Sequence, residues 1–268
     1  MKRHRSTTSF FMAFSALLLT LTLTPLCFAQ AKPTAQAPAQ RQLFSVLFLR
    51  IKSGMGAEWR EFRKNETLPM LQKAAVKQQT LWNTAVFGEG GYLIVTPIES
   101  LAQYDNPGPA VRALGQEGAT AYQAKAARFT ESFHSVAIET RPDLSIAPKP
   151  GDQAKLIVVT TTTIVPGRGE DYENFVRTAV VPAIRKAAPK GYLVSQVVYG
   201  GNVNQYFSVV LLDSFADLQR WREAFAKEGA AARLNVKSAG IVTNRENAIY
   251  RFVPELSVMP MAQKAENK

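Results

Sequence analysis

Apolar runs of strand length alternate along the chain with stretches in which apolar residues recur every three or four positions. Residues 43–51 are apolar at nearly every position, which is typical of a strand buried on both faces. In the following stretch, residues 54–75, Trp59, Phe62 and Leu71 fall on one helix face, and acidic residues occupy the first turn. The pattern therefore opens with a strand followed by an amphipathic helix.

The same pattern returns at a constant spacing of 113 positions. The equivalent pairs are Trp59 and Tyr172, Phe62 and Phe175, and Pro69 and Pro182. A proline inside a helix removes a hydrogen bond and clashes with the preceding turn, so each proline predicts a kink or a break, after which it starts a second short helix. A proline at the same place in both copies indicates a duplicated unit.

The remaining elements follow in the same order in both copies. In the first copy we expect a hairpin (81–87 and 92–96, with a glycine-rich turn at 88–91), a helix (100–129, interrupted near 106–109) and a strand (134–141). In the second we expect a strand (155–165), a kinked helix (169–188), a hairpin (192–199 and 206–212), a mostly helical stretch (215–239) and a strand (248–253). Both halves thus have the order β-α-β-β-α-β.

That order is the ferredoxin-like unit, in which two helices cover one face of a sheet. The sequence predicts an α+β protein with unit 1 at residues 42–145, a linker at 146–154, unit 2 at 155–257 and a flexible tail at 258–268. The bare sheet faces are apolar and need a partner. We therefore expect the two tandem units to pack sheet to sheet as an intramolecular α+β barrel.

The N-terminus has the pattern of a secretory signal peptide, predicted at residues 1–29. A basic start precedes an apolar run, and a small-x-small site ends at Ala29. The alternative is a membrane-anchor helix, but the run is short and a Pro/Ala/Gln-rich spacer follows at 30–41. Cleavage would remove Cys27, the chain's single cysteine, and would leave no transmembrane span. We expect a periplasmic or secreted bacterial protein.

The formal net charge of +11 is spread over both halves without a block of lysine or arginine. No nucleic-acid motif accompanies it, so we expect an ordinary basic surface and no nucleic-acid partner. A multi-histidine metal centre is excluded because His134 is the single histidine after residue 4. No nucleophile-elbow sequence appears, and no catalytic residue is assigned.

The architecture resembles the dimeric α+β barrel superfamily, and within it the NIPSNAP-like, EthD-like and antibiotic-biosynthesis-monooxygenase-like groups. The likeness rests on the glycine turns, the aromatic pairs Trp59/Phe62 and Tyr172/Phe175, and the two proline segments, and it covers about residues 43–257. It implies pockets in the barrel and a range of activities that includes cofactor-free oxygenases and haem enzymes. Fold alone does not decide among them.

Six residues are candidates for a ligand pocket. They are Arg50, Trp82, His134, Glu139, Tyr250 and Arg251. In haem-binding relatives a histidine near a helix end is the axial ligand, which makes His134 a minority hypothesis for haem beside the commoner surface or capping role. Otherwise we expect no cofactor.

Each of the other candidates also has two interpretations. Trp82 resembles a substrate-holding tryptophan of cofactor-free oxygenases, but Asn83 beside it points to the other sheet face, which favours core packing for Trp82. Glu139 and Arg251 hold equivalent positions on the closing strands and either meet or are solvated separately. Arg50 either anchors an anionic ligand or marks the exposed end of its strand. Tyr250 is expected at a pocket wall.

The leading functional hypothesis is the binding of a small, mostly apolar ligand in a barrel pocket. A cofactor-free or haem-dependent oxygenase is the second, and a structural or interaction module that uses its aromatic residues only as core is the third. Whether the protein is an enzyme, and whether it forms oligomers, is left open by the sequence.

Overall fold

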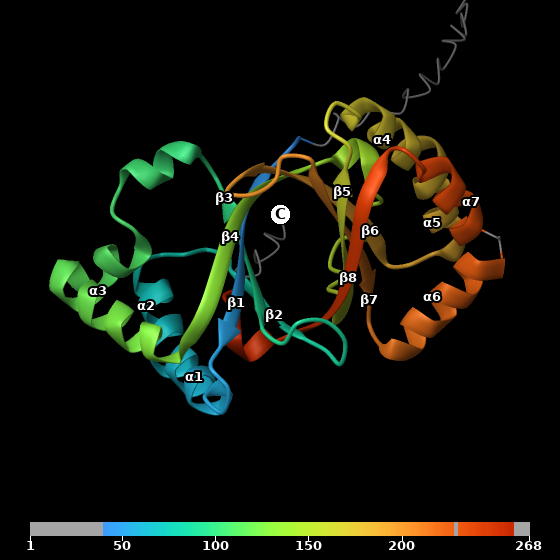
Figure 1. Ribbon diagram of the computed structural model, residues 1–268. Helices are drawn as coiled ribbons and strands as arrows, with labels where there is room; N and C mark the ends of the chain where they lie inside the picture. Colours follow the sequence, from blue (N-terminus) through green and yellow to red (C-terminus); the bar gives the residue numbers. More distant parts are fainter. Residues whose placement is uncertain (1–39, 228–229, 260–268) are drawn as a thin grey trace, which may run out of the picture. The chain divides into compact units, whose positions relative to one another are not determined.

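A computed structural model describes residues 40–227 and 230–259. This part of the chain folds as an α+β protein around a closed antiparallel barrel (Figure 1). The first-half strands are β1 (Leu43–Ile51), β2 (Thr80–Thr84), β3 (Tyr92–Ile98) and β4 (Thr130–Thr140). The second-half strands are β5 (Leu156–Ile164), β6 (Gly191–Tyr199), β7 (Gln205–Leu212) and β8 (Val242–Phe252).

The strand order around the barrel is β1-β3-β2-β8-β5-β7-β6-β4. The first half therefore runs β4-β1-β3-β2 and the second β8-β5-β7-β6, which is the same arrangement with each number raised by four. The register repeats as well, because Leu49 faces Tyr92 in the first half and Thr162 faces Tyr206 in the second. These equivalent pairs allow the two halves to be compared position by position.

The two half-sheets are joined by hydrogen bonds at both edges. Strand β2 pairs with β8, and β4 pairs with β6. The predicted α+β barrel is confirmed, with the correction that the sheets do not only face each other: they continue into one another. Closure leaves no free sheet edge in the barrel.

Helices cover the outside of the barrel on two sides (Figure 1). Those of the first half are α1 (Gly56–Phe62), η1 (Arg63–Thr67), α2 (Leu68–Lys73), η2 (Leu101–Asp105) and α3 (Pro109–Phe129), followed by the short η3 (Pro142–Leu144). Those of the second are α4 (Gly169–Phe175), η4 (Val176–Val180), α5 (Val181–Ala187), α6 (Phe215–Lys227) and α7 (Ala230–Ser238), followed by η5 (Pro254–Leu256). Among the described helices none is long and apolar enough to cross a bilayer.

The predicted proline kink takes the same form in both halves. Pro69 and Pro182 each occupy the second position of a short helix, as expected, and a π-helical turn precedes each of them. Proline has no N–H to donate to the carbonyl four residues earlier, so the helix widens by one residue there instead of ending. The repeated sequence thus encodes a repeated local distortion.

Several boundaries differ from the prediction because strand pairing extends the closing strands. Strand β4 begins at Thr130, four residues before the predicted start, and β8 begins at Val242, six residues before it. These early segments are mainly polar and exposed, so the apolar pattern did not reveal them. The predicted interruption before α3 is confirmed, and Gly115, with a φ of 72°, adds a kink inside that helix.

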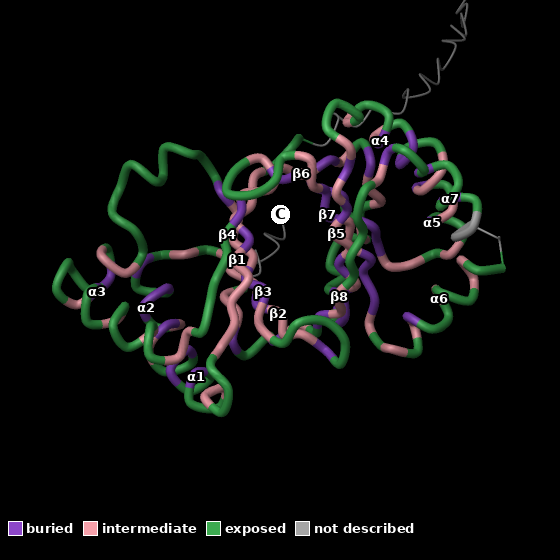
Figure 2. The backbone as a smooth tube through the Cα atoms, viewed as in Figure 1, coloured by how far each residue is buried: buried purple, intermediate pink, exposed green. Residues whose placement is uncertain are grey.

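Buried residues lie along the strands and on the sheet-facing sides of the helices, while much of α3 and of the hairpin loops is exposed (Figure 2). The outer face of β1, with Leu47, Leu49 and Ile51, packs beneath the helices of its own half. Its inner face, with Val46 and Phe48, packs across the barrel against β5 and β7. Both faces of the strands are therefore apolar, as the sequence predicted.

Candidate functional site

A chamber of about 520 Å³ lies inside the barrel. Successive side chains of a strand point to opposite faces, so every second residue lines it. On β1 these are Phe44, Val46 and Phe48, and on β7 they are Phe207, Val209 and Leu211. We call this space the barrel chamber. Its volume falls within the range of small-molecule sites in proteins, roughly 300 to 1,000 Å³.

Among the described residues that line the barrel chamber, none has an ionisable side chain. Four carry hydroxyl groups, and the other sixteen are apolar apart from the indole N–H of Trp82. The hydroxyls belong to Thr80, Thr140, Ser145 and Ser195. The other lining residues are Phe44, Val46, Phe48, Trp82, Leu93, Val95, Ile138, Pro142, Ala147, Ile157, Val159, Leu193, Val194, Phe207, Val209 and Leu211. Such a wall favours apolar groups and offers a few hydrogen bonds that fix orientation.

Trp82 is the one predicted site residue in this lining. Its ring lies 5.0 Å from that of Phe252, and its indole Nε1 donates to Thr80 Oγ1 at 3.3 Å. Asn83 lies on the other face of β2, where it is in register with Tyr92. The two side chains therefore do not share a pocket, as the sequence indicated, and Trp82 is both core and chamber wall.

A second, smaller space of about 330 Å³ lies at the end of the barrel where β1 finishes. We call it the polar rim. Arg50, His134 and Tyr250, three predicted site residues, line it together. Phe48 lines both the polar rim and the barrel chamber, and its ring lies 6.4 Å from that of His134. The rim and the barrel chamber thus share Phe48 in their walls.

Arg50 donates to Glu89 at 2.5 Å across the polar rim. Glu89 comes from the glycine-rich loop between β2 and β3. This loop passes so close to β1 that a Cβ on Gly91 would lie 2.7 Å from the Leu49 carbonyl oxygen, which excludes any larger residue there. Burial raises the pKa of Tyr250, and the Glu89 carboxylate raises it further, so its hydroxyl stays a hydrogen-bond donor at neutral pH.

Glu139 and Arg251 do not meet and do not line the barrel chamber. Their neighbours Ile138 and Tyr250 face inward, so strand alternation turns both charges outward. Glu139 pairs with Arg41 at 2.9 Å, and the Arg251 guanidinium lies 5.9 Å from the centre of the Phe215 ring. For these two the interpretation as separate, solvated charges applies, and their place in a common pocket was wrong.

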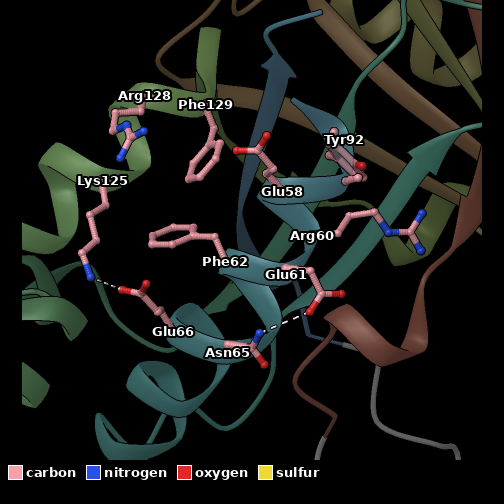
Figure 3. A pocket seen from close by; sticks show the side chains of 12 residues that line it. Glu58, Arg60, Glu61, Phe62, Asn65, Glu66, Tyr92, Lys125, Arg128 and Phe129 are labelled. Carbon is pink, nitrogen blue, oxygen red and sulfur yellow. Dashed lines mark hydrogen bonds and ion pairs between the residues drawn. The ribbon is translucent and has the colours of Figure 1, made fainter. Parts of the chain in front are cut away.

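A wider cleft of about 1,020 Å³ lies on the outer face of the first half-sheet, between α1, η1 and α3 (Figure 3). We call it the helix-side cleft. Half of its lining is charged, by Glu58, Arg60, Glu61, Glu66, Lys125 and Arg128. The Lys125 ammonium binds Glu66 at 2.9 Å, and Phe62 and Phe129 lie between the charged walls. Tyr92 contributes from β3, and burial raises its pKa.

The equivalent region of the second half is packed. Tyr206, the counterpart of Tyr92, contacts Tyr172 with ring centres 4.6 Å apart and donates to Glu173 at 3.1 Å. Glu173 in turn accepts from the buried guanidinium of Arg141. Leu234 and Ile241 complete one large cluster with Tyr172 and its neighbours. The cleft is therefore a feature of the first half.

Comparison with known proteins supports the fold. No family model matches the chain, and no curated protein matches it in sequence. Among solved structures, a candidate monooxygenase from Lactobacillus acidophilus is 10% identical, with 82% of this chain and 97% of that chain covered at a TM-score of 0.53. An anthrone oxidase-like protein is 14% identical over 81% of this chain and 93% of that one, also at 0.53.

A chlorite dismutase from Candidatus Nitrospira defluvii, in complex with imidazole, is 8% identical over 80% of this chain and 92% of its own, at a TM-score of 0.53. At such identities the likeness concerns the fold alone. It supports the predicted α+β barrel fold, while the superfamily and the NIPSNAP-like, EthD-like and antibiotic-biosynthesis-monooxygenase-like assignments stay predictions. It assigns no activity to this chain.

Three of the residues proposed from the sequence line the polar rim and one, Trp82, lines the barrel chamber, while most of the chamber wall was missed. Alternate positions of β5 and β7, such as Val159 and Val209, carry the missing signal. Both faces of these strands are apolar, so the pattern does not tell the inner face from the outer one.

Proposed function

We propose that the protein binds a small, mostly apolar ligand in the barrel chamber. The observation that carries this is the lining: a space of about 520 Å³ is walled by sixteen apolar residues and four hydroxyl-bearing ones, with no ionisable group among the described residues. Transfer of apolar surface out of water contributes about 25 cal/mol per Å². A chamber already formed by paired strands adds little ordering cost when the ligand enters. An interaction module that needs no cavity is less well supported.

The test is a calorimetric titration of the full mature chain with dodecanol as the apolar probe. The variant Val209→Trp places a large ring in the barrel chamber and should weaken binding roughly 100-fold, which corresponds to about 2.7 kcal/mol. The matched control Ala57→Trp adds the same ring at the exposed edge of the helix-side cleft and should change affinity less than about 2-fold.

Circular dichroism of both variants would separate loss of the site from loss of the fold. If wild type does not bind dodecanol, or if Val209→Trp binds as well as Ala57→Trp, the chamber is not the ligand site. Native mass spectrometry of the purified protein would in addition detect a retained molecule and give its mass.

A cofactor-free oxygenase is the second candidate. Trp82 in the wall of an apolar chamber favours it, because a substrate could stack on that ring. Against it, the residues that line the chamber supply no general base, and Asn83 faces away. Oxygen consumption with an added anthrone as substrate would support this candidate if it were lost in Val209→Trp and kept in Ala57→Trp.

The residues around His134 do not fit a haem site well. His134 is an exposed side chain at the polar rim, and the surrounding walls include Arg50, Glu89 and Ser132. The apolar barrel chamber has no histidine in its lining. The proposed function therefore does not involve haem. Absorption spectra after addition of haem test this, because a saturable Soret shift lost in His134→Ala would contradict it.

We further propose that the two halves arose by tandem duplication and that the protein is exported. The first rests on the equal strand orders and the repeated π-turns, and the second on the signal-peptide pattern of residues 1–29, which lie outside the described residues. Oligomer formation stays a prediction. Fractionation of bacterial cells that express the chain, with N-terminal sequencing, would test export and cleavage.

A further inference from the structure

The polar rim has the composition of a site for an anionic head group. Its donors come from three elements: Arg50 from β1, Ser132 and His134 from β4, and Tyr250 from β8. Glu89, from the loop before β3, is the acidic side chain among the residues that line it. A guanidinium matches the geometry of a carboxylate and binds it through charge-assisted hydrogen bonds.

Arg50 lies in register with the wall of the barrel chamber. It follows Phe44, Val46 and Phe48 on the same face of β1, at alternate positions. Two residues of a strand span about 7 Å, so the Arg50 position lies about 7 Å beyond Phe48 along the strand. A ligand whose apolar part fills the chamber and passes Phe48 brings its head group to Arg50.

The present partner of Arg50 is replaceable. The Glu89 side chain is 87% exposed and that of Arg50 39%, and exposed ion pairs contribute little to stability, about 0 to 1 kcal/mol. An anionic head group that is tethered by its tail in the chamber can therefore displace Glu89 without a large cost.

We propose that the ligand class is a single-chain amphiphile with a carboxylate head, its tail in the barrel chamber and its carboxylate on Arg50 at the polar rim. This inference rests on the proposed function, because it uses the same chamber. It adds the charge of the head group and the residue that recognises it.

The test compares three probes with the same tail at low salt: laurate, dodecanol and dodecylammonium, each below its micelle concentration. Wild type should bind laurate roughly 10-fold more tightly than dodecanol, the effect of one charge-assisted contact. Arg50→Gln should remove this preference and leave dodecanol affinity within about 2-fold. Glu89→Gln should tighten laurate about 3-fold, because the competing carboxylate is gone.

Lys52→Gln is the matched control. It removes the same charge two residues further along, from an exposed side chain that does not line the polar rim. In Lys52→Gln the affinity for laurate should change less than about 2-fold, because only the long-range attraction between the positive charge and the anion is lost. A loss as large as that in Arg50→Gln would mean that overall charge, and not the rim, attracts the anion.

The outcomes separate this inference from the proposed function. If the three probes bound wild type equally and Val209→Trp abolished binding, the chamber would stand as the ligand site, but the proposal of a carboxylate head group would be overturned. Preference for dodecylammonium would also overturn the carboxylate proposal, and it would indicate that Glu89 binds a cationic head group. Failure of all three probes to bind wild type would overturn the proposed function itself.

Discussion

The barrel chamber and the helix-side cleft lie on opposite faces of the same strands. On β3, Leu93 and Val95 line the chamber, while Tyr92 lines the cleft. The cleft is about twice as large, but half of its lining residues are charged, and two of them, Lys125 and Glu66, already form an ion pair. The chamber is smaller and its walls are apolar. The chemistry of the wall, rather than the volume, therefore identifies the better ligand site.

The second half explains why the cleft is open. In the first half, Ala113 of the long helix α3 belongs to a cluster with Met70 and Leu71 that is separate from the cluster around Trp59. In the second half, Leu218 of α6 and Leu234 of α7 belong to the same cluster as Tyr172. A shared element order thus produces a closed outer layer in one half and an open one in the other. The inner face is built by both halves, so its apolar lining does not depend on this difference.

The largest expected effect on stability comes from a charge placed in the barrel chamber, compared with the same charge placed in the helix-side cleft. Val159→Asp buries a carboxylate in the barrel chamber and should lower the free energy of unfolding by about 3 kcal/mol at pH 7. Burial raises the pKa of the new group above its unfolded value, so the part of the penalty that comes from the charge should vanish below about pH 4 and grow as the pH rises, while the cost of burying the neutral acid remains. Urea unfolding at several pH values measures both.

Ala57→Asp is the counterpart on the helix-side cleft. Residue 57 is exposed, and surface substitutions change stability by about 0.5 kcal/mol or less. If Val159→Asp were as mild as Ala57→Asp, the chamber would be an aqueous space and the contrast between the two hollows would disappear.

Trp82 should report binding in the chamber by its fluorescence. Dodecanol should change the emission of wild type, and Trp82→Phe should lose that change while affinity falls about 3-fold through lost contact area. Trp59→Phe is the control, because Trp59 is buried under α1 on the outer face, next to Tyr92. A signal that depends on Trp59 would place the probe on the helix side.

A smaller effect is expected from the ion pairs of the cleft. Lys125→Ala removes the partner of Glu66 and should lower the free energy of unfolding by about 0.5 kcal/mol or less, because both side chains are about half exposed. The affinity for dodecanol should not change. If calorimetry showed that Lys125→Ala binds dodecanol about 10-fold more weakly, the barrel chamber would not be the binding site.

The smallest expected effect is that of pH on the neutral probe. None of the residues that line the barrel chamber titrates near neutrality, so dodecanol affinity should vary less than about 2-fold between about pH 5 and pH 9. The helix-side cleft, with three glutamates in its wall, would be expected to respond at the acidic end. A steep pH dependence of the dodecanol affinity would therefore indicate that the probe does not bind in the barrel chamber.

Much of the fold could be predicted because it repeats. The glycine turns and Pro69 and Pro182 fixed the helix positions, and the apolar strands indicated a sheet covered on both faces. The early starts of β4 and β8 could not be predicted, because their polar residues join the barrel only through pairing with β1 and β5. The domain limits at residues 145 and 155 remain predictions.

The candidate site was predicted in part for a similar reason. Arg50 stands out as a charge near the end of an apolar strand and His134 as the single histidine after residue 4, and the structure brings both to the polar rim. Glu139 and Arg251 stand out equally as charges on apolar strands. Each lies one position away from an inward-facing residue, so its side chain points to the outer face of the barrel. The helix-side cleft was missed because its existence depends on how α3 lies against α1 and η1, which no local pattern records.

The most direct measurement is a crystal structure of the protein with dodecanol that carries bromine at the end of its tail, with the bromine located by anomalous scattering. The account predicts one strong peak inside the barrel, among Trp82, Phe207 and Val209. A peak in the helix-side cleft near Phe62, or no peak in crystals saturated with the probe, would contradict the claim that the barrel chamber is the ligand site.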